Sequence, residues 1–133
     1  MTGALDGLRV VDFGQYVAAG PLIAQMLADH GADVVRVDPP GDPRREHPAN
    51  AILQRGTRSI VLDPKRAADR CVAQRLVRAT DVVVENFRPG VMDRFGLRAE
   101  VITGENQALI YCSTPGFASD DAPLQCRCTR RRR

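Results

Sequence analysis

Three consecutive valines, Val82, Val83 and Val84, constrain the fold of this chain more than any other feature of its sequence. Valine is branched at Cβ and favours strands, and no polar residue alternates with these three. Such an uninterrupted run is typical of a strand buried on both faces, as in parallel sheets covered by helices. The run therefore predicts a strand over residues 82–85, inside the parallel sheet of an α/β protein.

The residues directly after this strand carry candidate ligand-binding groups. Asn86 and Arg88 follow the strand, and Arg94 lies in the short amphipathic segment that comes next. Open α/β sheets bind their ligands at the carboxyl ends of their strands, and guanidinium groups pair well with phosphates. The segment therefore predicts a site for an anionic, phosphate-bearing ligand.

Segments typical of strands and of helices alternate along the rest of the chain. Strands are expected at residues 8–13, 33–38, 58–63, 82–85 and 108–112. Helices are expected at residues 21–31, 65–79, 90–95 and 98–105, and a polar loop from Pro39 to about residue 50. This order predicts an α/β fold with an open, parallel, Rossmann-like sheet and flanking helices.

Length and composition limit the class of protein. A chain of 133 residues forms at most one domain and can bury a core. No apolar run approaches the roughly 20 residues that a membrane-spanning helix needs. The first residues do not combine a basic region with an apolar block, as a signal peptide would. We therefore expect a cytoplasmic protein without a membrane partner.

The four cysteines do not indicate a metal site. Cys71 is expected on the apolar face of the helix at 65–79, and Cys112 at the end of a strand, which predicts buried thiols. Cys126 and Cys128 are separated by one residue, whereas zinc ligand pairs have two to four between them. We expect no metal. The expected apolar face of the helix comprises Ala68, Cys71, Val72, Leu76 and Ala79.

The net charge of +3 comes from the last residues of the chain. Residues 122–133 contain five arginines and no acid, and the remainder has 14 basic and 16 acidic residues. We expect an α/β domain over residues 1–119 and an irregular basic tail over residues 120–133. The tail has two interpretations, a nucleic-acid-binding segment or non-native sequence after a break in the reading frame. The abrupt change of composition favours the second, so no nucleic-acid partner is expected.

Five ordered blocks of the sequence resemble the CoA-transferases of family III, which include formyl-CoA transferase and α-methylacyl-CoA racemase. Residues 5–13 are similar to the opening "PL-x-G-[IL]-x-V-[LV]-D", and residues 18–21 to the "x-AGP" segment. Residues 27–38 resemble "LADLGADVIKVE", and residues 58–65 match "[KR]-S-[IV]-x-LD-x-K". Residues 85–96 match "ENF-x-PG-x-x-x-R-x-G". The resemblance covers about residues 4–119 and implies part of the large α/β domain of such an enzyme.

The resemblance also implies a binding site for CoA thioesters, with CoA or acyl-CoA as substrate and no covalently bound cofactor. Carried over by position, it nominates these residues for binding: Ala18, Ala19, Leu62, Asp63, Lys65, Asn86, Phe87, Arg88 and Arg94. The basic residue that the family often has just after the second strand is Pro39 here. Arg44 or Arg45 could substitute for it.

The resemblance implies no catalytic residue in this chain. Family transferases use an aspartate that forms a mixed anhydride with the acyl group, and racemases use a histidine and an aspartate. Both sets lie beyond the segment that matches Gly116 and Phe117. We therefore expect a truncated and inactive portion of an enzyme that acts on acyl-CoA and a carboxylic acid. Transfer and racemisation both stay open, and full-length family members form an interlocked homodimer.

Two other functions were weighed against this one. A nucleotide-binding Rossmann domain would need G-x-G-x-x-G after the first strand, and residues 14–21 do not fit that pattern. A basic-tailed interaction module would depend on residues 122–133. The candidate residues also have simpler roles: Asn86 could satisfy backbone at a strand end, Lys65 could be a solvated charge, and Arg94 could pair with Asp93 or Glu100.

Overall fold

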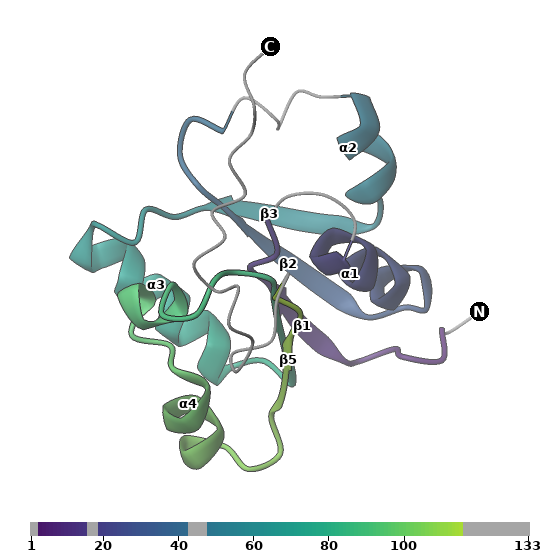
Figure 1. Cartoon of the computed structure of the whole chain (residues 1–133). Helices are drawn as coiled ribbons and strands as arrows, with labels where there is room; N and C mark the ends of the chain where they lie inside the picture. The colour runs from purple at the N-terminus through teal and green to yellow at the C-terminus, as the bar shows by residue number, and fades with distance from the viewer. Residues whose placement is uncertain (1–2, 16–18, 43–47, 116–133) are drawn as a thin grey trace.

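A parallel sheet forms the centre of the computed structural model, which describes residues 3–15, 19–42 and 48–115 (Figure 1). In these ranges the sheet has five strands in the order β3-β2-β1-β4-β5, and every neighbouring pair is parallel. The strands are β1 (Arg9–Asp12), β2 (Asp33–Asp38), β3 (Thr57–Val61), β4 (Val82–Glu85) and β5 (Ile110–Ser113). The predicted open, Rossmann-like parallel sheet is confirmed.

Helices cover both faces of the sheet, as Figure 1 shows. Helix α1 (Ala19–Asp29) packs on one face and also contacts α2 (Pro48–Leu53). Helices α3 (Ala67–Arg78) and α4 (Ala99–Glu105) lie on the other face, together with a short 3-10 helix (Met92–Phe95). The chain thus crosses to one face between β1 and β2 and to the opposite face between β3 and β4.

Strand β4 is buried on both faces, as its valine run predicted. Val82 and Val84 pack with Ala24 of α1, whereas Val83 packs with Phe13 and Val77 on the side of α3. Alternate side chains of a strand point to opposite faces, so a strand between two helical layers has to be apolar on both. All four residues of β4 are buried, Glu85 included.

Two expectations from the sequence were wrong. Helix α2 occupies the end of the segment expected to be a polar loop, and it begins at Pro48, whose missing N–H is not needed in a first turn. Cys71 is exposed rather than buried, because α3 turns Ala73 and Val77 toward the sheet. Residues two apart on a helix lie about 200° apart, so Cys71 faces away from Ala73. The real apolar face of α3 is rotated from the expected one.

The predictions for the C-terminal end of the chain lie outside the described residues. The proposed boundary at residue 119 and the basic tail, with Cys126 and Cys128, fall outside the described residues. So do Arg44 and Arg45. Among the helices that are described, none has the length and apolar character that a membrane crossing requires.

Candidate functional site

The helices move from one face of the sheet to the other between the neighbouring strands β1 and β4. We call the carboxyl ends of these two strands the switch point, and the candidate site lies there. These two strands are neighbours, but the helix after β1 packs on one face of the sheet and the helix before β4 on the other. In open α/β sheets the loops at such a point separate and leave a crevice for ligands. Asn86, the first residue after β4, is therefore placed where a ligand is expected.

Asn86 joins the loop after β4 to the loop after β1. Its Oδ1 accepts a hydrogen bond of 2.6 Å from the backbone N–H of Gln15, and its Nδ2 donates to the carbonyl oxygen of Gln15. The Gln15 side chain in turn donates from Nε2 to the carbonyl oxygen of Val37, at the end of β2. The loop after β1 is thus held from both neighbouring strands. Sequence reasoning did not identify Gln15, because its partner is 71 residues away.

Two glycines allow the first turn of α1 to approach this loop closely. A Cβ atom on Gly20 would lie 2.9 Å from the Cα of Gly14 and 3.3 Å from Cγ of Asn86. A Cβ on Gly14 would likewise lie 2.9 Å from the Cα of Gly20, and a backbone contact that short excludes a side chain at either glycine. The N-terminal end of α1 consequently lies beside Asn86, and the first N–H groups of a helix have no carbonyl partner within it. Ala19 is the first residue of this helix, and Ala18 lies outside the described residues.

The turn after β3, at one edge of the sheet, is held by several hydrogen bonds. Asp63 Oδ1 accepts the backbone N–H of Lys65 at 2.9 Å, and the N–H of Asp63 donates to Oδ2 of Asp69 at 2.9 Å. Arg70 Nη1 donates to the carbonyl oxygens of Pro64 and Lys65. These contacts assign Asp63 to holding the turn and leave the Lys65 side chain exposed at its surface. Asp69 and Arg70, which hold it from α3, were not predicted.

The other predicted site residues divide between the core and the surface. Leu62 is 4% exposed and belongs to the core on the side of α3, against which Phe87 packs partly. Phe87 also donates its backbone N–H to Oε2 of Glu85 at 2.7 Å. Arg88 and Arg94 are exposed. Leu62 can therefore offer a ligand chiefly its backbone, and Phe87 its backbone and the edge of its ring. The two arginines offer positive charge.

Arg94 does not form the ion pairs considered for it. Within the described residues it is Arg98 whose Nε lies 3.6 Å from Asp93 Oδ1 and 4.0 Å from Glu100 Oε2. The side chains of Arg88 and Arg94 make no ion pair with any described residue, so both guanidinium groups are available to an anion.

A hollow of about 380 Å³ adjoins these residues at the carboxyl ends of β4 and β5. Phe87 and Arg88 line it together with Tyr111 of β5, and Glu85, Asp93 and Glu100 are among its charged walls. Burial, and then these three carboxylates, raise the pKa of Tyr111, so its hydroxyl stays protonated. The hollow offers a phenol donor beside an arginine, although acidic groups surround both.

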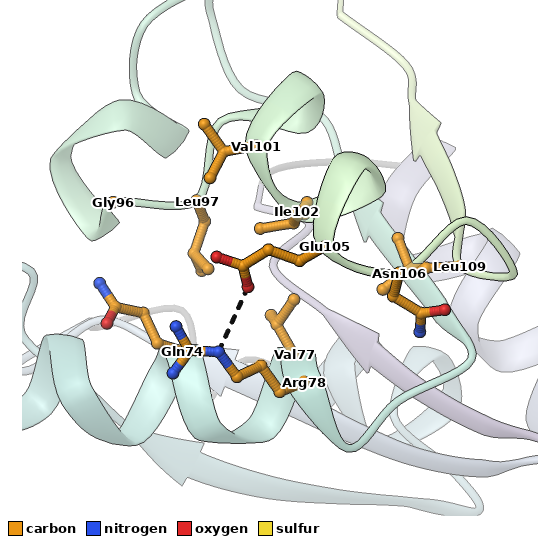
Figure 2. A pocket seen from close by; sticks show the side chains of 10 residues that line it. All are labelled: Gln74, Val77, Arg78, Gly96, Leu97, Val101, Ile102, Glu105, Asn106 and Leu109. Atoms are coloured by element: carbon orange, nitrogen blue, oxygen red, sulfur yellow. Dashed lines mark hydrogen bonds and ion pairs between the residues drawn. The ribbon is translucent and has the colours of Figure 1, made fainter.

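A second hollow, of about 340 Å³, lies between α3 and α4, away from all predicted site residues (Figure 2). Val77, Leu97 and Ile102 form its apolar floor, and Arg78 Nε pairs with Glu105 Oε2 across it at 3.3 Å. It is placed near the amino ends of the strands, where Leu109 precedes β5. Its position separates it from the candidate site.

Three ionisable side chains that were not predicted are buried near the carboxyl ends of β1 and β2. They are Asp12 at the end of β1, and Arg36 and Asp38 of β2, each no more than 7% exposed. Arg36 Nε lies 3.7 Å from Asp12 Oδ2, and Arg36 Nη2 lies 3.4 Å from Asp38 Oδ1. In the described ranges no cluster of three or more His, Cys, Asp or Glu is placed to hold a metal ion.

Comparison with known proteins identifies the family. The profile of CoA-transferase family III matches residues 5–127, which is most of the chain. The chain belongs to this family. Among curated members, it is 50% identical over 117 residues to the CoA-transferase/lyase DddD of Marinomonas sp. (strain MWYL1). It is 41% identical over 128 residues to the formyl-CoA:oxalate CoA-transferase of Rhodopseudomonas palustris (strain TIE-1).

Solved structures of similar proteins have the same fold. Rv3272 from Mycobacterium tuberculosis matches 93% of this chain with a TM-score of 0.84 and 35% identity. A CAIB/BAIF family protein from Brucella suis matches 95% of it with a TM-score of 0.83 and 36% identity. The resemblance inferred from the five sequence blocks and the fold that it implied are thereby confirmed.

This family III chain spans only part of the length of its relatives. The match covers 88% of the chain but 14% of the Marinomonas protein and 30% of the Rhodopseudomonas one. It covers 37% of each of the two solved chains. The activity, substrates and partners of a whole enzyme are therefore questions for the proposal that follows.

Proposed function

We propose that this chain binds the CoA part of acyl-CoA thioesters along the carboxyl edge of its sheet, in an enzyme that transfers CoA between carboxylic acids. The observation that carries the proposal is that the family's "ENF-x-PG" segment lies at the switch point and ties the β1 loop through Asn86. The two curated relatives named above are CoA-transferases, which favours transfer over racemisation. Acyl-CoA and a carboxylic acid are the proposed substrates.

The positions of the exposed cations suit a long anionic ligand. The Lys65 turn follows β3, and Arg88 and Arg94 follow β4, with β2 and β1 between them. Three strand spacings of about 4.8 Å separate the two groups by roughly 14 Å along this edge. CoA carries phosphates on an elongated pantetheine–nucleotide skeleton, so it can reach cations at both places. Each cation would form a charge-assisted bond to a phosphate oxygen.

The proposal assigns binding rather than bond-making to the described residues. Asp63 holds a turn and Glu85 accepts a backbone N–H, so neither carboxylate is placed as a nucleophile. Asp12 is fully buried. An acyl-transferring carboxylate would have to reach the thioester from elsewhere in the working enzyme, including a second chain of the homodimer that the family implies.

Calorimetric titration of the purified chain with CoA tests the proposal. We expect saturable binding that weakens by about tenfold in Arg94→Ala, the loss of one charge-assisted bond. Lys65→Ala and Arg88→Ala should weaken it similarly. Arg75→Ala is the matched control, because Arg75 is an exposed arginine of α3, far along the helix from the carboxyl edge. Absence of binding at millimolar CoA, or an equal loss in Arg75→Ala, would refute the proposed site.

A further inference from the structure

Asp12 is a buried carboxyl group for which the proposed function has no role so far. It is 0% exposed, at the last position of β1 and on the face of the sheet that α1 covers. Among the described residues its Oδ2 has no hydrogen-bond partner, and neither has Nη1 of Arg36 beside it. Unsatisfied buried polar atoms cost free energy, so a chain that keeps them here requires a reason.

Among the described residues, the charged groups that face Asp12 come from β2. Arg36 is its neighbour across the strand pair, and Asp38 lies two residues further on the same face. Helix α1, which covers this face, has no ionisable side chain before Asp29, and α2 has none at all. Glu85 of β4 accepts the N–H of Phe87 and lies on the opposite face. Within the described part of the chain, Arg36 therefore lies between the carboxyl groups of Asp12 and Asp38.

Asp12 is also hydrogen-bonded to the loop that leads to the proposed site. Its Oδ1 accepts the backbone N–H of Gly14 at 2.7 Å, in a buried turn. Gly14 is in close contact with Gly20, and the next residue, Gln15, is bonded to Asn86. A single carboxylate thus holds the first residue of a chain of contacts that ends at the "ENF-x-PG" segment.

We propose that Asp12 is a positioning residue for CoA: its carboxylate holds the Gly14–Gln15 turn in the shape that binds the ligand, and the Arg36–Asp38 pair sets the charge of that carboxylate. The inference rests on the proposed function. A hydrogen bond to an ionised carboxylate is roughly twice as strong as one to a neutral group. The turn is consequently held more firmly when Asp12 is charged than when it is protonated.

The surroundings of Asp12 place this change of charge near neutral pH. Burial raises the pKa of Asp12 to about 6, against the lowering effects of the Gly14 N–H and of Arg36, while Asp38 raises the pKa further. Replacing Asp38 with a neutral residue should therefore lower the midpoint at which Asp12 titrates. Loss of the carboxyl group in Asp12→Asn should abolish the titration but keep an oxygen for Gly14.

Amide NMR of the full chain between pH 4.5 and 8 tests the first half of the inference. The Gly14 amide signal should shift with a midpoint near 6 in the wild-type chain. It should titrate at lower pH in Asp38→Asn and should not titrate in Asp12→Asn. The dispersion of the other signals reports whether each variant is folded. A Gly14 signal that titrates identically in Asp12→Asn, or that does not move in the wild type, would overturn the inference.

CoA affinity, measured for both proteins over the same pH range, tests the second half. The ratio of the two dissociation constants at each pH cancels the titration of the CoA phosphates. We expect the wild-type chain to gain about fivefold over Asp12→Asn between pH 5 and 7.5, from the stronger bond to Gly14. By linkage, saturating CoA should also lower the Gly14 midpoint.

The outcomes separate this inference from the proposed function. If CoA binds both proteins with a ratio that is constant with pH, the positioning role is wrong and the CoA site stands. If CoA binds neither protein, the proposed function fails and the inference, which rests on it, fails with it.

Discussion

The two faces of the sheet are built differently where they meet the carboxyl edge. On the side of α3 the buried residues form one apolar cluster that reaches the strand ends, with Phe13 and Phe95 in contact at a ring-centroid distance of 5.4 Å. On the side of α1 the apolar cluster is smaller and ends at Val84. In register with Val84, Asp12 and Arg36 occupy buried positions next to those that apolar residues fill on the other face.

The two faces differ in what they contribute: one mainly stabilises the fold, and the other positions the loops of the proposed ligand site. Burial of apolar surface contributes roughly 25 cal/mol per Å², so the α3 face supplies the larger part of the folding free energy. Buried ions lose hydration that their mutual attraction only partly restores, so the α1 face contributes less. The ionic face, however, is the one that holds Gly14 and faces Asn86. We infer that stability is concentrated on one face and ligand geometry on the other, and four substitutions test this contrast.

The largest effect is expected on the apolar face. Phe95→Ala removes a ring that is 5% exposed and packs against Phe13, which should lower the free energy of unfolding by about 3–5 kcal/mol. Urea unfolding followed by circular dichroism measures the loss. Ile52→Ala, at a side chain 62% exposed, is the control and should change stability by less than about 0.5 kcal/mol. A small loss in Phe95→Ala would mean that the α3 face is not the main source of stability.

The second effect is a pH dependence that comes from the ionic face. Burial raises the pKa of Asp12 to about 6 in the folded chain, from an ordinary value of 3.8. The folded state holds the Asp12 proton more tightly than the unfolded state, so protonated Asp12 stabilises the fold. This stabilisation is complete below pH 3.8 and is lost as the pH rises through 6. The shift corresponds to about 3 kcal/mol. Asp12→Asn has no carboxyl proton to lose. The free energy of unfolding of this variant, minus that of the wild type, should therefore rise by about 3 kcal/mol between pH 3.5 and pH 8.

Asp33→Asn provides the control for this experiment. Asp33 is also in β2, but its side chain is 52% exposed and pairs with Arg58 at the surface. Its removal should change stability by less than about 1 kcal/mol at either pH. Equal pH dependence in wild type and Asp12→Asn would show that the buried cluster does not titrate as described.

A smaller effect is expected where the two loops are joined. Asn86→Ala removes both hydrogen bonds to the backbone of Gln15 and leaves partly buried polar groups, at an expected cost of about 1–3 kcal/mol. The free energy of CoA binding should fall by more than the free energy of unfolding, because the β1 loop is released at the site itself. Thermal unfolding and CoA titration of the same variant compare the two losses. A stable variant with unchanged CoA affinity would contradict the positioning role of this bridge.

The smallest effect is expected at the ion pair between α3 and α4. Arg78 and Glu105 are 63% and 50% exposed, so Glu105→Gln should cost less than about 1 kcal/mol. CoA affinity should not change, because the hollow that this pair crosses lies away from the carboxyl edge (Figure 2). A larger loss, seen in the urea midpoint, would mean that polar contacts also stabilise the apolar face.

Most of the fold could be predicted from the sequence because its signals are local. The valine run at residues 82–84 identified a strand buried on both faces, and the alternation of strands and helices identified a parallel sheet. The errors were local too. The apolar face of α3 was set by Ala73 and Val77 rather than Cys71, since several small apolar residues on a helix allow more than one face. Helix α2 was missed because a short helix has little pattern of its own.

Sequence patterns alone were sufficient to predict the five strands, the helices other than α2, the family and the edge of the sheet where a ligand is expected. The tertiary structure was needed to show which of the nominated residues hold turns, as Asp63 does, and which are open to solvent, as Arg88 and Arg94 are. It alone brought Asp12 next to Arg36, and Gln15 next to Asn86, 71 residues away. Hydrophobic periodicity reports how a segment is buried, whereas polar partners are chosen by strand order and register, which no local pattern contains.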